Sequence, residues 1–232
     1  MKLGVLITAF NEPLIVPLIE HYKSYVDKIV VTVSKKPWMG NIKADDTYKR
    51  AKSTGVTVIN KDWRIEHEQR NEGMKHLKDM DYVIVSHADT WFTVEDLKKL
   101  KTLKLTDLHY ACNTLTFWKD YETVIDPDIY LPTIIVRSDA KFNHLINIED
   151  QKAVTKVISN ITCYHLSWVK TDEELLKKIN SYSHAQEIDK NWFKEVWLQW
   201  KPGMTNIAPT VPSDYKGTRK HSLPKEIRKW QE

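Results

Sequence analysis

The segment Asp81-Tyr82-Val83-Ile84-Val85-Ser86-His87-Ala88-Asp89 is the most informative part of this chain. Its run of apolar and β-branched residues predicts a buried parallel strand, which delivers His87 and Asp89 to the carboxyl edge of a sheet. Ligands of open α/β sheets bind at that edge. Because His87 and Asp89 are two residues apart, they share one side of an extended chain. We therefore expect both side chains to reach one metal ion and, through it, a diphosphate.

Strand and helix patterns alternate through the first half of the chain. This order is typical of an α/β protein with a mostly parallel central sheet that helices cover on both faces. Apolar periodicity and cap residues predict strands at 2–9, 28–34, 56–59 and 81–89, and helices that follow Pro13 and lie at 45–52 and 66–77.

The alternation loosens after about residue 105. A capping box at Thr171 opens an expected helix, and Trp192 and Trp200 lie on one face of another. The simplest division is a core at 1–170 and, in the same domain, a helical extension with a basic tail at 171–232. The expected strands in this half lie at 109–118, 130–137 and 160–168.

Composition narrows the class of protein. The 232 residues are 41% hydrophobic and 28% charged, which suits a soluble chain with a buried core. No apolar run approaches the roughly 18 residues of a membrane span. The polar Asn11 and Glu12 interrupt the apolar start where a signal peptide would continue. Cys112 and Cys163 are too few for a disulfide scaffold. We therefore expect a cytoplasmic protein, with the cytoplasm of a phage host as one setting.

Positive charge gathers near the C-terminus, although the formal net charge of the chain is only +4. Between residues 216 and 229, six basic residues stand against the single acidic residue Glu226. Such a tail suits a polyanionic partner, such as nucleic acid or an anionic membrane surface. A solvated, poorly ordered tail is the alternative interpretation.

The sequence lacks the glycine-rich motifs that usually bind phosphates. It has six glycines and neither G-x-G-x-x-G nor G-x-x-x-x-G-K, which argues against a dinucleotide-binding turn and a P-loop. A divalent metal held by carboxylate and imidazole is another way to neutralise a diphosphate. Asp89 suits a hard cation, and His87 shifts the preference towards manganese over magnesium. The alternative is that both residues merely end a strand.

Other polar residues have a functional and a structural interpretation. Glu66 and Arg70 are one helical turn apart and could form a simple surface ion pair, an interpretation that explains Trp63 and Asn71 less well. His165 is either a metal ligand or a hydrogen-bonded core residue. Trp168 either stacks on a sugar or base or is buried. The tryptophans at 192, 197 and 200 favour core packing, and the pair at 149–150 offers a general base.

Together these segments resemble the GT-A fold glycosyltransferases of the family 2-like group. Residues 7–12 are similar to that group's first strand and nucleotide loop. Residues 63–73 resemble its W-x-x-E-x-x-x-R-N-x-G helix, and His87-Ala88-Asp89 occupies the place of its D-x-D metal motif. Residues 163–174, with 183–185 farther on, are similar to a subgroup signature of the form H-x-x-W-V.

The resemblance implies a Rossmann-like GT-A fold, a nucleoside-diphosphate sugar as donor and a divalent metal, Mn²⁺ or Mg²⁺, on the diphosphate. Asp89, His165 and His87 would hold the metal. Asp150, next to Glu149, would be the catalytic base, with Glu122, Asp126 and Asp128 as rivals. The residues expected to line the donor site are Ala9, Asn11, Glu12, Trp63, Arg70, His87 and Trp168.

The reaction expected from the resemblance is transfer of a sugar to a hydroxyl with inversion at the anomeric carbon. The acceptor is a hydroxymethylated pyrimidine in DNA, which the basic tail allows, or a cell-surface saccharide. Two other functions compete with this one. A sugar-phosphate nucleotidyltransferase normally has a glycine-rich loop near its first strand, whereas residues 8–13 contain no glycine. A non-enzymatic nucleic-acid-binding module leaves His87, His165 and Asp89 without a role.

Overall fold

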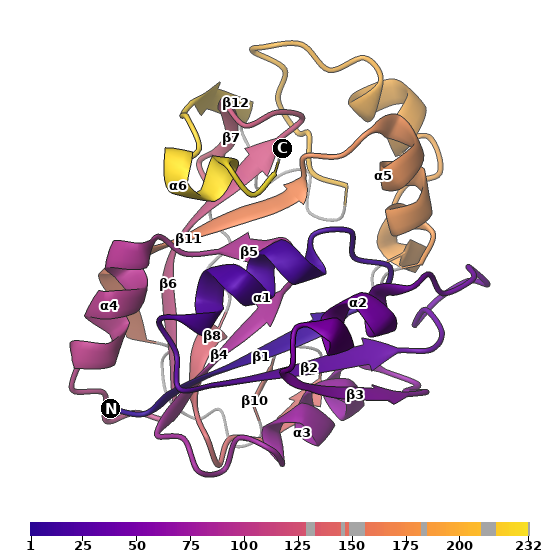
Figure 1. Ribbon diagram of the computed structural model, residues 1–232. Helices are drawn as coiled ribbons and strands as arrows, with labels where there is room; N and C mark the ends of the chain where they lie inside the picture. The colour runs from indigo at the N-terminus through magenta and orange to yellow at the C-terminus, as the bar shows by residue number, and fades with distance from the viewer. Residues whose placement is uncertain (129–132, 145–146, 149–155, 182–184, 210–216, 232) are drawn as a thin grey trace.

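A computed structural model describes residues 1–128, 133–144, 147–148, 156–181, 185–209 and 217–231. Figure 1 shows a twisted sheet with helices on both sides and the C-terminal segments gathered at one end. The strands are β1 Leu3–Ala9, β2 Lys28–Ser34, β3 Thr57–Lys61, β4 Tyr82–His87, β5 Thr90–Trp91, β6 His109–Trp118, β7 Thr123–Asp126, β8 Thr133–Arg137, β9 Phe142–His144, β10 Asn147–Ile148, β11 Lys156–Trp168 and β12 Gly217–Lys220. The helices and helical turns are α1 Ile15–Lys23, α2 Thr47–Ser53, α3 Glu66–Met74, α4 Val94–Thr102, α5 Asp172–Ile179, η1 Ala185–Glu187, η2 Phe193–Trp197 and α6 Lys225–Arg228.

The main sheet has a parallel half and a mixed half. Its strand order is β12-β7-β6-β8-β4-β1-β2-β3, and β3, β2, β1 and β4 are parallel neighbours. Strand β8 lies antiparallel between β4 and β6, and β11 pairs in parallel with β6 and antiparallel with β5. This topology confirms the predicted α/β class with a mostly parallel core.

Strand β1 is buried on both faces because its alternate residues serve two separate cores. Leu3, Val5 and Ile7 pack with α1 on one face, and Leu6 packs with Met74 of α3 on the other. All four of these side chains of β1 are fully buried. The period of two along the strand therefore places helices on both sides of the sheet.

Helix α3 lies very close to the sheet at Gly73. A methyl group at Gly73 would meet the Leu6 side chain and would lie 3.1 Å from Cγ2 of Thr32. Both contacts belong to buried strand residues, so they cannot simply move aside. A glycine inside a helix disfavours the helix, which weakens the prediction of one here. Gly73 nevertheless allows α3 to pack closely on the sheet.

We expect Gly73→Ala to lower the free energy of unfolding by about 1–3 kcal/mol, because the added carbon overpacks this contact. Urea denaturation of the variant measures the loss. A second variant, Leu6→Ala in the Gly73→Ala background, provides the control. If Leu6 causes the clash, the double variant loses less than the sum of the two single losses; strict additivity would contradict the contact.

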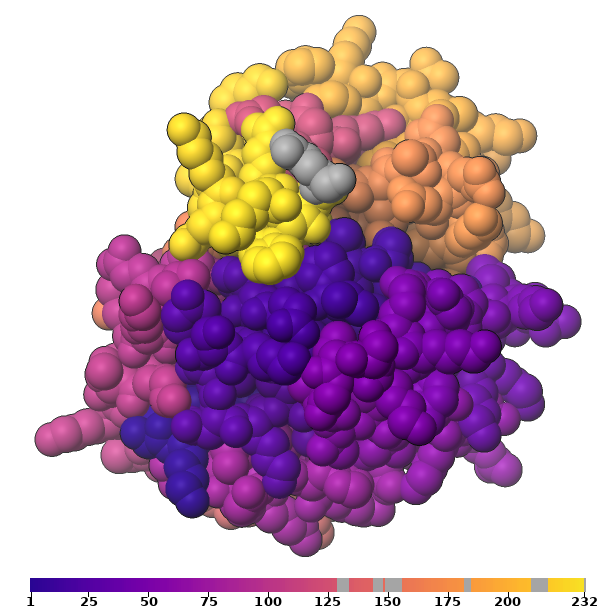
Figure 2. Space-filling model, viewed as in Figure 1, coloured from indigo at the N-terminus to yellow at the C-terminus, as the bar shows by residue number. Residues whose placement is uncertain are grey.

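The described part of the basic tail is folded against the rest of the chain. Strand β12 pairs antiparallel with β7, and Leu223 and Ile227 are buried in the same core as α1. The ring of Trp230 lies 6.4 Å from that of His21, and Figure 2 shows this C-terminal segment (yellow) lying against the N-terminal region (indigo). The interpretation as a poorly ordered tail is therefore wrong for residues 217–231. The boundary at residue 170 stays a prediction.

A third core is built from tryptophans. Trp118, Trp192 and Trp197 are buried together, and the rings of Trp118 and Trp197 have centroids 5.1 Å apart. Core packing of Trp192 and Trp197 is thus confirmed, although the turn that carries them is π-helical and not the expected α-helix. Among the described residues, no helix is both long and apolar enough to cross a membrane.

Candidate active site

The candidate site lies at the carboxyl ends of β1 and β4. The chain runs from β1 outward to β3 and then returns to place β4 on the other side of β1, so the strand order reverses between these two strands. Such a switch point is where open α/β sheets bind ligands. Thr8 and His87 are register partners here, and Ala9 and Asp89 follow them.

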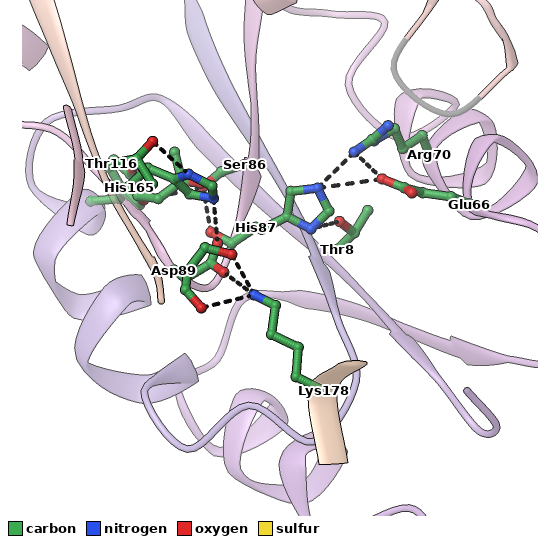
Figure 3. Close-up of polar contacts among 12 residues, drawn as sticks. Thr8, Glu66, Arg70, Ser86, His87, Asp89, Thr116, His165 and Lys178 are labelled. Atoms are coloured by element: carbon green, nitrogen blue, oxygen red, sulfur yellow. Dashed lines mark hydrogen bonds and ion pairs between the residues drawn. The ribbon is translucent and has the colours of Figure 1, made fainter. Parts of the chain in front are cut away.

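His87, whose side chain is 39% exposed, contacts a polar cluster on the α3 side of the switch point (Figure 3). Its Nε2 atom lies 2.8 Å from Nη2 of Arg70, and its Nδ1 atom lies 3.2 Å from Oγ1 of Thr8. Oε1 of Glu66 also lies 3.3 Å from Nε2 of His87. A guanidinium can only donate, so in the shorter contact with Arg70 the Nε2 atom accepts, and in that tautomer Nδ1–H donates to Thr8. Arg70 also forms an ion pair with Glu66, and both side chains are almost fully buried.

Asp89 belongs to a second cluster, directed towards β11 and α5. Its Oδ2 atom accepts a hydrogen bond of 3.0 Å from Nζ of Lys178, and its Oδ1 atom lies 3.7 Å from Nε2 of His165. The backbone carbonyl of Asp89 accepts from the amide of Leu166 at 2.8 Å, which fixes the turn to β11. Nδ1 of His165 lies 3.4 Å from Oγ1 of Thr116.

Burial and neighbouring charges act in opposite directions on these groups. Burial raises the pKa of Asp89, but Lys178, His165 and His87 outweigh it, and the pKa lies well below its ordinary value. Burial lowers the pKa of His165 to about 4 against the opposing charge of Asp89. At neutral pH the site therefore holds an ionised Asp89 and a neutral His165.

Glu12 lies close enough to this cluster to respond to it. Burial raises its pKa to about 7, and the positive charge of Lys170 opposes the shift. The folded chain thus binds more protons at Glu12 than the unfolded chain between pH 4.5 and about 7. Since the carboxyl group is destabilised on ionising, its contribution to the free energy of unfolding falls as the pH rises through this window.

We expect Glu12→Gln to remove this dependence. Relative to the unmodified chain, the variant gains stability at pH 8 and loses that gain at pH 5, where Glu12 is protonated in the folded state. Urea denaturation at the two pH values measures both differences. A stability difference that is equal at pH 5 and pH 8 would show that the carboxyl group is not destabilised by burial.

The described residues do not form the predicted three-donor metal site. Strand β4 ends at His87, and Ala88 and Asp89 lie in a turn, so the rule that alternate residues share one side no longer applies. His87 turns to Arg70 and Thr8, which engage both ring nitrogens. Only Asp89 and His165 face each other, and Lys178 holds the other oxygen of Asp89. No cluster of three ligand-type side chains occurs among the residues described.

A cavity of about 380 Å³ adjoins the site at the carboxyl ends of β1, β2 and β3. Asn11, with φ of 54°, adopts the left-handed conformation that asparagine tolerates. Its side chain donates to the carbonyl of Lys43 and accepts from the amide of Asp45, at 3.0 and 2.8 Å. Asn11 thereby ties the β1 loop to the segment before α2. The cavity is lined by Asn11, Ser34, Asp45, Thr47, Tyr48 and Asn60, among others.

Other predicted donor residues lie farther apart. Trp63 lines a different cavity, with His67 and Phe142, between α3 and β9. Trp168 is partly buried beside the tryptophan core, its ring 5.9 Å from that of Trp118. Ala9 is buried at the end of β1. These placements bring Asn11 and Glu12 to the switch point, and they leave the roles of Trp63 and Trp168 as predictions.

The candidate bases divide into three groups. Glu149 and Asp150 lie outside the described residues. Glu122 and Asp126 form ion pairs with Arg228 and Arg219 of the tail. Asp128 lies closer to the site, because its Oδ2 atom accepts from the amide of Thr116 at 2.8 Å, and Thr116 is the neighbour of His165.

Sequence reasoning missed three participants: Thr8, Lys170 and Lys178. The signal for Lys178 was weak, since a lysine in the last turn of a capped helix usually faces solvent and favours the helix dipole. Lys178 reaches the site because α5 packs beside the end of β11, a long-range contact that the sequence does not reveal. Lys178 also donates to Oγ of Ser167, on the strand that carries His165.

No family model matches this chain, and no curated protein sequence matches it. Solved structures that resemble it include three of TarS from S. aureus. One aligns with a TM-score of 0.45 and 15% identity over 77% of this chain and 38% of that chain. A structure of TarS residues 1–349 in complex with UDP-GlcNAc aligns with a TM-score of 0.47 and 14% identity, over 77% of this chain and 64% of that chain. A further structure of TarS residues 1–349 aligns with a TM-score of 0.45 and 14% identity, over 77% of this chain and 63% of that chain.

The chain therefore spans less than two thirds of the length of each of these TarS chains. The TM-scores all lie below 0.5, so we derive the function from the residues of the site itself.

Proposed function

We propose that this chain is a glycosyltransferase that takes its sugar from a nucleoside-diphosphate sugar. The observation that carries the proposal is the charged cluster around Asp89 and Lys178 at the switch point, beside the cavity that Asn11 lines. Glu12, which follows Asn11, responds to the charges of Asp89 and Lys178, so cavity and cluster are neighbours. The resemblance of residues 63–73 and 87–89 to the GT-A glycosyltransferases supports the same reaction.

The donor would bind across this edge of the sheet. The nucleoside would occupy the cavity between the β1 loop and α2, which Asn11 and Asn60 line. The amide nitrogen of each already donates one hydrogen bond to a backbone carbonyl and keeps a second N–H for a base or ribose. The diphosphate would lie at the switch point, where lysines supply positive charge. The expected manganese or magnesium is not part of this proposal, because the donor atoms of His87 point away from Asp89 and His165.

The proposed reaction inverts the anomeric carbon. The acceptor hydroxyl attacks that carbon from the face opposite the diphosphate, the bond from carbon to phosphate oxygen breaks, and a carboxylate takes the hydroxyl proton. Asp150 is the proposed base and Glu149 its neighbour. The negative charge that develops on the leaving diphosphate is stabilised by groups already in place, which is the largest source of catalysis in such sites.

A transfer assay tests the proposal. The protein is incubated with a panel of labelled sugar nucleotides. UDP-GlcNAc is included because one of the similar TarS structures is a complex with it. Hydroxymethylated DNA and an oligosaccharide serve as separate acceptors. Labelled acceptor together with released nucleoside diphosphate is the expected result, and NMR of the product should show inversion.

Other outcomes point to other functions. Release of pyrophosphate from a nucleoside triphosphate and a sugar phosphate would identify a nucleotidyltransferase instead. Tight duplex binding without reaction of any sugar nucleotide would favour a nucleic-acid-binding module. In the described tail, Arg219 and Arg228 already pair with carboxylates, which reduces the charge available to DNA.

A further inference from the structure

Lys178 is held at the switch point by several contacts at once. It belongs to the last turn of α5, and its side chain is only 21% exposed. Besides Asp89, its Nζ atom donates to the hydroxyl of Ser167 and, at 3.3 Å, to the carbonyl of the same residue. The ring of Trp168 lies 5.8 Å from Nζ. These contacts hold the ammonium of Lys178 in one position, whereas the side chain of an ordinary surface lysine is flexible.

The position of Lys178 is the one that a metal on Asp89 would need. A divalent cation bound through Asp89 would compete with the ammonium for the same carboxylate and would be repelled by its charge. The neighbouring His87 cannot compensate, because Arg70 and Thr8 engage its ring. Asp89 thus has a built-in cation as its partner.

Lys170 adds a second positive charge from the same segment of chain. It lies between the end of β11 at Trp168 and the start of α5, and its charge acts on both Glu12 and Asp89. The charges of Lys170 and Lys178 therefore both act on the carboxyl groups of Glu12 and Asp89. A nucleoside diphosphate carries at least two negative charges. Because Asp89 already offsets part of the charge of Lys178, Lys170 supplies the further positive charge that the diphosphate needs.

We propose that Lys178, assisted by Lys170, binds the diphosphate of the donor in place of a divalent metal. This inference rests on the proposed function. The contact to the carbonyl of Ser167 is the longest of those that Lys178 makes, so a phosphate oxygen replaces it at least cost. Asp89 holds the ammonium in position before the donor binds and as the leaving group gains charge.

The test is a calorimetric titration of the metal-depleted protein with UDP, GDP, dTDP and ADP, in EDTA and in Mn²⁺. The expected result is that at least one nucleotide binds in EDTA, with an affinity within about 3-fold of that in Mn²⁺. Lys178→Met should weaken this binding by about 10- to 100-fold, as expected for the loss of a charge-assisted hydrogen bond. Lys178→Arg keeps the charge and should recover most of the loss.

Lys177→Met is the matched control. Lys177 is the preceding residue of the same helix, is 62% exposed and pairs only with Glu173 among the contacts described for it. Its replacement should leave nucleotide affinity unchanged within about 2-fold. An equal loss in both variants would mean that general charge, and not the placement of Lys178, attracts the nucleotide, which overturns the inference.

Two further outcomes separate the inference from the function on which it rests. Nucleotide binding by the unmodified protein that occurs in Mn²⁺ and disappears in EDTA overturns the inference and leaves the proposed function standing. Absence of binding by all four nucleotides in both conditions overturns the proposed function, and the inference with it. Because both outcomes use the unmodified protein, they do not depend on the folding of a Lys178 variant.

Discussion

Replacing Asp89 with asparagine is expected to reduce sugar transfer at least 100-fold while the chain stays folded. The amide oxygen can still accept a hydrogen bond from Lys178, but it carries no negative charge to hold the ammonium or to face His165, so the groups that stabilise the leaving diphosphate are held less firmly. Removing one such preorganised group typically costs about 10²- to 10³-fold in turnover. Release of nucleoside diphosphate, followed at saturating donor, measures the loss.

The matched control for this prediction is Asp79→Asn. Asp79 forms an ion pair with Lys28 at 2.9 Å, nearly the same distance as in the pair of Asp89 and Lys178, but it is 59% exposed. Its loss should leave turnover unchanged, because an exposed ion pair contributes little. Full activity of Asp89→Asn would show that the Asp89 carboxylate does not contribute to sugar transfer.

Arg70→Met is expected to produce the largest loss of stability. Arg70 and Glu66 are 1% and 5% exposed, so the substitution removes the guanidinium that offsets a buried carboxylate. Breaking a buried pair in this way costs about 3–5 kcal/mol in the free energy of unfolding. Urea denaturation measures the effect.

The control is the pair of Glu95 and Lys99, which has the same spacing along a helix but lies on the surface. Lys99→Met should cost less than about 0.5 kcal/mol. The double variant Glu66→Gln with Arg70→Met should recover part of the loss, because no buried charge is then left alone. A loss for Arg70→Met as small as that for Lys99→Met would mean that the buried pair contributes no more than a surface pair.

Much of the fold could be predicted because local patterns agree with the final packing. The strands at 28–34 and 109–118 have the predicted bounds, and helix α3 begins at the predicted Glu66. At Thr171 both hydrogen bonds of the predicted capping box are present. These features depend on residues close in sequence, so the sequence reports them directly.

Short paired strands could not be predicted in the same way. Strands β5 and β7 have two and four residues, too few for a periodic pattern, and they exist because β11 and β12 pair with them. The antiparallel insertion of β8 between β4 and β6 is also a long-range choice. Residues 130–132 of the expected strand lie outside the described residues.

The sequence did not predict how the candidate site residues are arranged. Asp89 and His165 face each other at the switch point, whereas His87 at the end of β4 contacts Arg70 and Thr8. The turn that begins at Ala88 separates His87 from Asp89, and the docking of α5 brings Lys178 in. Neither the turn at Ala88 nor the docking of α5 can be read from the spacing of the ligand-type residues. The spacing therefore predicted three metal donors, whereas His87 does not join Asp89 and His165.

A crystal structure of the protein with a bound nucleoside diphosphate, grown in EDTA, tests the central claim most directly. We predict density for the diphosphate between the ends of β1 and β4, in contact with Nζ of Lys178, and the nucleoside in the cavity beside Asn11 and Asn60. A nucleotide bound anywhere else, with Lys178 still donating only to Asp89 and Ser167, would contradict the proposed function of this edge of the sheet.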